Sequence, residues 1–256
     1  MINKLKKVFF FDIETYEKYD GTNGEMIKNS MIPSLKVREN FEQNKKIGKL
    51  YPVLLGNKTF TLGGLSQWGR QNKWFFEDRL EMKKKMLALT TQAIKEGRNA
   101  VFYVHNGEFD IPRIFKEEYL EFDLINKYSG SKIWIITPKI QLNLKCKNCK
   151  NEWIFECGKG IDRTKCPKCG ENKKIPCGTI RDTMNFLGRN DTKALSEIGR
   201  ELGIEKLETP LEITKPEELK EYLTRDLEIT EKFIESFYNM NKIINKELGI
   251  GKEGKE

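Results

Sequence analysis

One short segment constrains this chain more than any other: Val8–Thr15, with the sequence Val-Phe-Phe-Phe-Asp-Ile-Glu-Thr. Four apolar residues in a row, three of them aromatic, predict a buried strand. Side chains alternate along a strand, so Asp12 and Glu14 are expected to point to the same side. Neighbouring carboxylates repel each other and are costly to bury, and a shared divalent cation removes that cost. The spacing alone fits equally well a strand that ends in an exposed acidic turn.

A second apolar strand is predicted over Ala100–Val104, and a polar segment, His105-Asn-Gly-Glu-Phe-Asp110, follows it directly. Apolar residues at helical spacing predict a helix over Glu77–Lys95, with Gly97 as its stop signal. In α/β folds, ligand sites commonly lie at the ends of strands. The polar segment is therefore a candidate part of a site.

A third segment lies near the C-terminus, where Thr214 and Glu217 have the spacing of a helix N-cap and its partner. The helix is predicted to run to about Leu248. Tyr222 and Asp226 are four residues apart, so they share one face of it. A tyrosine and an aspartate on a charged helix are ordinary by themselves, and the pair gains meaning only beside the other two segments.

Together the three segments resemble the three exonuclease motifs of the DEDDy superfamily. The resemblance is closest to the proofreading domain of family B DNA polymerases, particularly the protein-primed type. The residues that carry it are Asp12-x-Glu14, Asn106-x-x-Phe109-Asp110 and Tyr222-x-x-x-Asp226. It covers nearly the whole chain except one cysteine-rich insert. It implies an α/β fold of the RNase H-like class, with a mixed sheet flanked by helices.

The resemblance also implies an activity: two-metal, 3′→5′ hydrolysis of single-stranded DNA to nucleoside monophosphates, in proofreading or DNA processing. Two Mg²⁺ or Mn²⁺ ions would be held by four carboxylates, those of Asp12, Glu14, Asp110 and Asp226. In this scheme Asp110 acts through water. Tyr222 would orient the attacking water, because a phenol with a pKa of ~10 is a poor base at neutral pH.

Further residues are implied as contacts of the DNA strand. Three of them, Thr15, Asn106 and Phe109, would touch the 3′-terminal nucleotides. Thr183 resembles the first residue of a Ser/Thr-Leu pair that contacts single-stranded DNA, although Met184 stands where leucine is usual. Lys206 lies near the place of a lysine beside the scissile phosphate. His105 fits a substrate contact and a capping or packing role equally well.

All six cysteines fall in Cys146–Cys177. Cys146-x-x-Cys149 and Cys166-x-x-Cys169 are separated by sixteen residues. This spacing predicts one structural Zn²⁺ bound by four thiolates, and a disulfide framework is the less favoured alternative. Cys157 and Cys177 occupy equivalent places in two similar halves. They would pack as small apolar side chains, face each other across the ribbon, or act as alternative ligands.

The zinc ribbon, residues 145–177, is predicted as an insertion into an exonuclease domain formed by residues 1–144 and 178–256. The strands that flank its start, Lys132–Thr137 and Lys139–Leu144, are expected to pair as a hairpin. The ribbon holds nine Lys or Arg and four Asp or Glu, a balance of 9 − 4 = +5 in a chain of net charge +8. This excess favours contact with nucleic-acid phosphates or an acidic partner, and a merely solvated surface is the alternative.

The expected partners are single-stranded DNA or a primer 3′ end and a separate DNA polymerase or replication protein. No apolar run approaches the ~20 residues of a membrane span, so a cytoplasmic protein with reduced thiols is expected. Residues 16–50 are predicted to form a long loop, and residues 249–256 a frayed tail. Two alternatives stay open: a non-catalytic zinc-ribbon module that binds DNA ends or a polymerase, and a 3′→5′ exoribonuclease.

Overall fold

The computed structural model describes residues 6–17, 58–69, 72–115, 125–127, 133–136, 138–157, 163–186, 193–208 and 216–247. Its main sheet has seven strands in the order β3 (Lys73–Phe76), β2 (Lys58–Gln67), β1 (Lys6–Glu17), β4 (Asn99–Val104), β11 (Gly178–Asp182), β6 (Ile133–Ile136) and β5 (Ile125–Lys127). The central strands β1, β4 and β11 are parallel to one another, and the outer strands pair antiparallel. The sheet is therefore mixed, as predicted.

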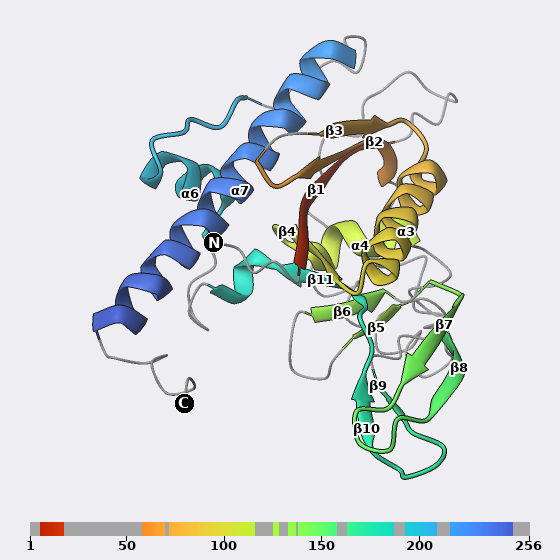
Figure 1. The fold of residues 1–256 in the computed structure, drawn as a ribbon. Helices are drawn as coiled ribbons and strands as arrows, with labels where there is room; N and C mark the ends of the chain where they lie inside the picture. The colour runs from red at the N-terminus through yellow and green to blue at the C-terminus, as the bar shows by residue number, and fades with distance from the viewer. Residues whose placement is uncertain are drawn as a thin grey trace, which may run out of the picture.

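Helices cover both faces of this sheet (Figure 1). On one side lie α3 (Arg79–Lys95) and α4 (Gly107–Phe115), and on the other lies the long helix α7 (Pro216–Glu247), with α6 (Leu195–Glu201) packed on it. The alternation along β1 assigns the faces. Phe9 and Phe11 belong to the core under α3 and α4, whereas Phe10 packs with Leu227 and Ile234 of α7.

The strongest predicted elements form. The strand around Asp12 is β1, the second apolar strand is β4, and the predicted helix is α3, whose N-cap Asp78 accepts a hydrogen bond from the backbone N–H of Leu80. Gly97 ends that helix with a φ of +70°, a conformation that favours glycine. The predicted cap Thr214, the loop beyond Glu17 up to residue 50 and the tail 249–256 lie outside the described residues.

The cysteine-rich segment forms two small hairpins that project from the main body (Figure 1). One pairs β7 (Ile140–Lys145) with β8 (Glu152–Cys157), and the other pairs β9 (Arg163–Lys165) with β10 (Asn172–Lys174). The hairpin predicted between Lys132–Thr137 and Lys139–Leu144 is wrong. Both edges of β6 are occupied by β11 and β5, so β7 pairs with β8 and the first ribbon hairpin starts at Ile140.

Candidate functional site

Three carboxylates meet on the α7 side of the sheet. Asp12 and Glu14 continue the face of β1 on which Phe10 packs against α7, and Asp226 lies on α7 itself, next to Leu227. One carboxylate oxygen from each of the three acids lies within 4.8 Å of the other two. Strand alternation and helix packing thus bring Asp226 close to Asp12 and Glu14, although Asp226 follows Glu14 by 226 − 14 = 212 residues in the sequence.

The pairing between β1 and β2 is irregular beside these acids. The pairing of β1 with β2 shifts register between Glu14 and Thr15. Such bulges bend a strand and re-aim the side chains beside them. The extra residue lies on β2, where Thr61 stands between Leu62, the partner of Glu14, and Phe60, the partner of Thr15.

The electrostatics of the three clustered carboxylates favour binding of a cation. Loss of hydration raises the pKa of Asp12 well above its usual range, and the carboxylates of Asp110, Asp226 and Glu14 raise it further. Burial also raises the pKa of Asp226, while Lys206 lowers it. Oδ1 of Asp226 is buried and has no hydrogen-bond partner among the described residues. A crowded, oxygen-only donor set with an unsatisfied oxygen fits a hard divalent ion such as Mg²⁺ or Mn²⁺.

One cation from the chain already lies in the cluster. Nζ of Lys206 is 2.7 Å from Oδ2 of Asp226 and 4.9 Å from the ring centroid of Tyr222. The attraction of Asp226 raises the pKa of Lys206 despite the opposing effect of burial. Lys206 therefore neutralises part of the charge of the acids and leaves the remainder for a bound cation.

The carboxylates open onto a cavity of about 470 Å³, within the usual range for small-molecule sites. Six of the predicted site residues other than the β1 acids line it: His105, Asn106, Phe109, Asp110, Lys206 and Asp226. Asp110 is 3% exposed and lies outside the group of three close carboxylates. Burial raises its pKa, Arg113 lowers it, and Glu14 and Asp182 raise it. Its position in the wall suits the indirect role that was predicted for it.

The turn into α4 shapes the opposite wall. Asn106 adopts a φ of +66°, a left-handed conformation that asparagine tolerates better than most residues. The next residue is Gly107, and a larger residue would not fit there, because its Cβ would lie 2.7 Å from a methyl group of Val104. Phe109 has one ring face covered by the guanidinium of Arg113, whose Cζ is 3.5 Å from the ring centroid. Arg113 also donates a hydrogen bond to the backbone oxygen of Phe109.

Three predicted residues do not line the cavity: Thr15, Thr183 and Tyr222. Thr183 is buried, and its hydroxyl lies 2.8 Å from Nδ1 of His105. The other ring nitrogen of His105 is 3.1 Å from the backbone oxygen of Lys193. Both nitrogens of the histidine are therefore engaged within the protein, which favours the packing role over direct substrate contact.

Sequence reasoning assigned no role to several residues of this site. Met184, Lys193 and Leu195 line the cavity, and Lys193 forms an ion pair with Glu201 at 2.7 Å. Asp182 is fully buried behind the wall. Met184 and Asp182 flank Thr183, which the resemblance assigns to DNA contact. The resemblance therefore indicated this turn but not the roles of its two neighbours.

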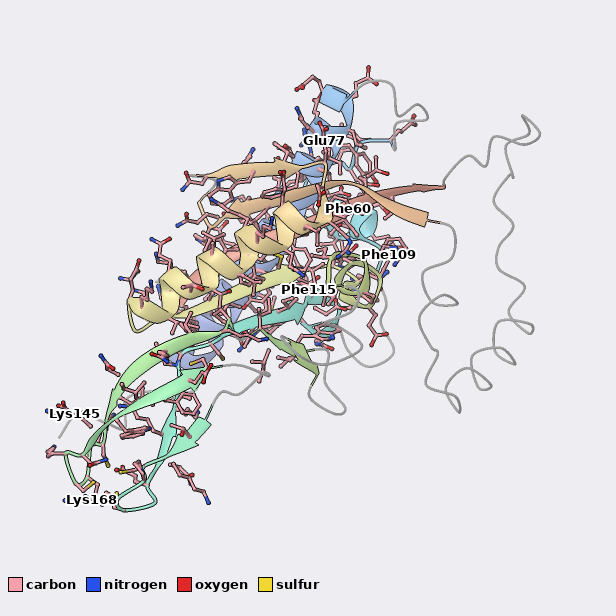
Figure 2. All side chains as sticks on the ribbon, turned by 90° about the vertical axis from the view of Figure 1, so that its right-hand side faces the viewer. Phe60, Glu77, Phe109, Phe115, Lys145 and Lys168 are labelled. Carbon is pink, nitrogen blue, oxygen red and sulfur yellow. The ribbon has the colours of Figure 1, made fainter. Side chains whose placement is uncertain are left out.

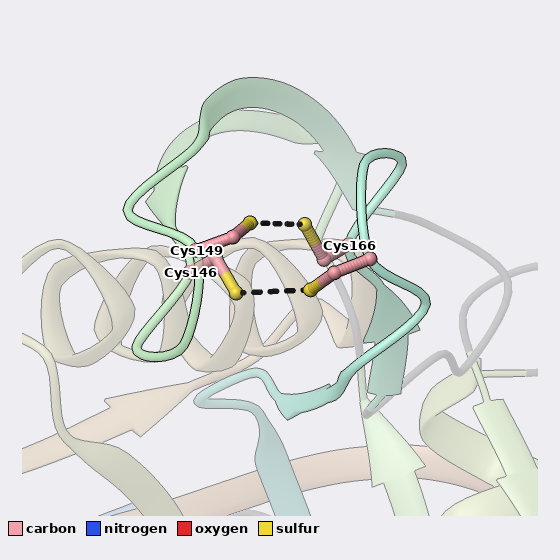
Figure 3. Close-up of side chains that lie close together, drawn as sticks. Cys146, Cys149 and Cys166 are labelled. Carbon is pink, nitrogen blue, oxygen red and sulfur yellow. Dashed lines mark hydrogen bonds between the residues drawn. The ribbon is translucent and has the colours of Figure 1, made fainter.

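The four knuckle cysteines form the second candidate metal site, as predicted. The sulfurs of Cys146 and Cys169 are 3.6 Å apart, as are those of Cys149 and Cys166 (Figure 3). Four sulfurs at ~2.3 Å from a tetrahedral zinc ion would be ~3.8 Å apart, whereas a disulfide is ~2.05 Å long. The cluster thus fits a metal ion and not a pair of disulfides.

The two remaining cysteines lie outside that cluster. Cys157 ends β8 and Cys177 immediately precedes β11, and both are buried. The N–H of Cys177 donates to the side-chain oxygen of Asn99, and its backbone oxygen accepts from the N–H of Ala100; both partners belong to β4, so Cys177 anchors the end of the ribbon to the main sheet. Of the alternatives for the pair, burial as small apolar side chains agrees best with these positions.

Models of protein families, curated proteins and solved structures were each compared with this chain, and none matches it. Within the described residues, no helix is both long and apolar enough to cross a bilayer.

Proposed function

We propose that this chain is a metal-dependent 3′→5′ exonuclease that hydrolyses single-stranded DNA ends to nucleoside monophosphates. The observation that carries the proposal is the convergence of Asp12, Glu14 and Asp226 within 4.8 Å in an open cavity that also contains Asp110. They correspond to the four acids that the resemblance to the DEDDy motifs implies, and they come from three distant segments of the chain. The mixed sheet with helices on both faces supports the RNase H-like class that the resemblance implies.

In this proposal, each residue of the site has a separate role in the reaction. Asp12, Glu14 and Asp226 would hold a pair of Mg²⁺ or Mn²⁺ ions, with Asp110 supporting them from the wall. When bound, these ions supply an activated water and neutralise the negative charge that develops on the leaving 3′ oxygen. Tyr222 lies beside Lys206 but does not line the cavity, so the water-orienting role that the resemblance implies would require its hydroxyl to turn toward the cavity. Phe109 and Asn106 line the space that the terminal nucleotide would occupy.

Digestion of labelled oligonucleotides tests the proposal. Single-stranded DNA with a 5′ label should shorten one nucleotide at a time in Mn²⁺ or Mg²⁺ and remain intact in EDTA. A 3′ label should be released at once as a mononucleotide. A matched RNA oligomer decides the sugar preference, because discrimination depends on contacts to the 2′-hydroxyl. Faster RNA digestion would make the protein an exoribonuclease. Tight DNA binding without any cleavage would favour the non-catalytic module.

The zinc ribbon, in this proposal, contacts the phosphates of the DNA strand. Zinc with four thiolates carries a charge of −2, so the ribbon's +5 becomes 5 − 2 = +3 once the metal is bound. The knuckle lysines Lys165 and Lys168 are exposed and form no ion pair within the described part of the chain. Figure 2 shows Lys145 and Lys168 at the tip of the ribbon, far from Phe109 at the cavity. A DNA strand would therefore meet these lysines well away from its 3′ end.

Salt dependence of DNA binding measures this contact. Lys165→Ala with Lys168→Ala should weaken binding of a long single strand and reduce the slope of log K against log salt by about 1.4, or 2 × ~0.7. The rate at saturating DNA should not change. The matched control is Lys84→Ala with Lys95→Ala on α3, two exposed lysines that likewise form no ion pair within the described residues. Equal slopes of log K against log salt for the two double variants would show that these ribbon lysines do not contact the DNA.

A further inference from the structure

Two turns that build the cavity wall meet at one buried side chain, that of Asp182. The parallel strands β4 and β11 lie side by side, and Asp182, the last residue of β11, is opposite Val104, the last residue of β4. From this common edge the chain turns into α4 through Asn106 and into η1 (Thr183–Phe186). Asp182 has no exposed surface and does not touch the cavity.

The carboxylate of Asp182 accepts three backbone hydrogen bonds. Oδ1 accepts from the N–H of Asn106 at 3.1 Å and from the N–H of Met184 at 3.0 Å, and Oδ2 accepts from the N–H of Gly107 at 3.0 Å. Two of these donors belong to the start of α4, where backbone N–H groups have no partner within the helix. The third belongs to the turn after β11. One side chain thus joins both turns.

The residues held by these bonds carry the wall of the site. Asn106 lines the cavity, and Phe109 and Asp110 follow in the first turn of α4. Met184 lines the cavity from the other turn. The side-chain hydrogen bond between His105 and Thr183 is a second connection between the same two turns. The position of Asp110 relative to Asp12 and Glu14 therefore depends on how firmly α4 is held against β11.

We propose that Asp182 is the positioning residue of the site: it holds the start of α4 so that Asn106, Phe109 and Asp110 face the β1 carboxylates. The kinetic part of this inference rests on the proposed nuclease function. Asparagine has the shape of aspartate but only one acceptor oxygen, so in Asp182→Asn its NH₂ group must face at least one backbone N–H. The wall would then shift, and displacements of about 1 Å can cost ~10²-fold in rate.

The experiment compares Asp182→Asn with Asp78→Asn. Asp78 also accepts a backbone N–H at the start of a helix, α3, but it is exposed and does not line the cavity. Hydrogen exchange is measured at the amides of Asn106, Gly107 and Met184, and kcat and KM are measured on a 5′-labelled oligonucleotide at a temperature at which each variant is fully folded.

For Asp182→Asn we expect amide exchange at the three positions to be at least ~10-fold faster and kcat/KM to fall ~10- to 100-fold. Asp78→Asn should leave both unchanged, even if its Tm falls. Normal exchange, or normal kcat and KM despite a lowered Tm, would overturn the positioning role. If the wild-type protein cleaves no oligonucleotide, the proposed function fails, and the exchange rates alone decide whether Asp182 holds the two turns.

Discussion

Replacing Asp12 with Asn and Glu14 with Gln in one protein is expected to lower exonuclease activity by at least about 10³-fold, because two of the three clustered carboxylates lose their charge. The amides keep the shape of the side chains, so the fold should survive. The matched control is Glu108→Gln, which neutralises an exposed carboxylate on α4 that does not line the cavity. Wild-type rates in the double variant would contradict the proposed chemistry.

The same double variant should be more stable than the wild type when no metal is present. The pKa of Asp12 is raised in the folded protein by lost hydration and by the carboxylates around it. The folded state therefore holds this proton more tightly than the unfolded chain, in which the pKa is about 3.9. Stability from this group is present at low pH and is lost as the pH rises through the raised pKa.

Thermal unfolding at several pH values in EDTA measures this effect. The Tm of the wild type should fall as the pH rises above about 4, and the Tm of the double variant should fall less. Mn²⁺ should raise the Tm of the wild type and have little effect on the variant, since a ligand stabilises only the state that binds it. An equal Mn²⁺ response in both proteins would show that the ions bind elsewhere.

The acids of this site follow from the resemblance of three segments to the exonuclease motifs, and local rules agree with parts of it. The alternation of a strand places Asp12 and Glu14 together, and the four-residue spacing on α7 places Asp226 on the same face as Tyr222. The cavity wall depends on non-local contacts. Asp182 bonds to residues 75 and 76 positions away, and no local pattern indicates that its side chain turns inward. For the same reason the sequence predicts only a polar segment after β4 and does not predict the helix α4.

The wrong hairpin has a similar origin. Ile133–Ile136 and Ile140–Lys145 are both short strands, and adjacent short strands pair in many folds. Their choice of partner is decided by strands farther along the chain, β11 for the first and β8 for the second. The cysteines were easier to predict, because the two Cys-x-x-Cys pairs already contain all four ligands and the spacing that lets one ion reach them.

Loss of zinc should unfold the ribbon and spare the seven-stranded sheet and its helices. The ribbon's described strands form only two two-stranded sheets, and isolated hairpins are at best marginally stable. Among the described residues between Lys139 and Cys177, none belongs to one of the four hydrophobic core clusters. A structural zinc ion contributes about 10–16 kcal/mol in small modules, more than so few apolar contacts supply.

Cys166→Ser removes one buried ligand and should reduce bound zinc from one ion per chain to nearly none by elemental analysis. Limited proteolysis should then cut within residues 140–177, while the main unfolding transition keeps its Tm, since the sheet and its helices have their own core. Cys157→Ala is the matched control: this cysteine is also buried but lies outside the cluster, so its variant should retain the metal. Zinc retained by Cys166→Ser, iron found in its place, or zinc lost from Cys157→Ala would each contradict this assignment. A ribbon that unfolds alone would also remove Lys165 and Lys168 from an ordered DNA contact, so Cys166→Ser should show the same shallow salt slope as the double lysine variant while its catalytic cavity continues to turn over in Mn²⁺.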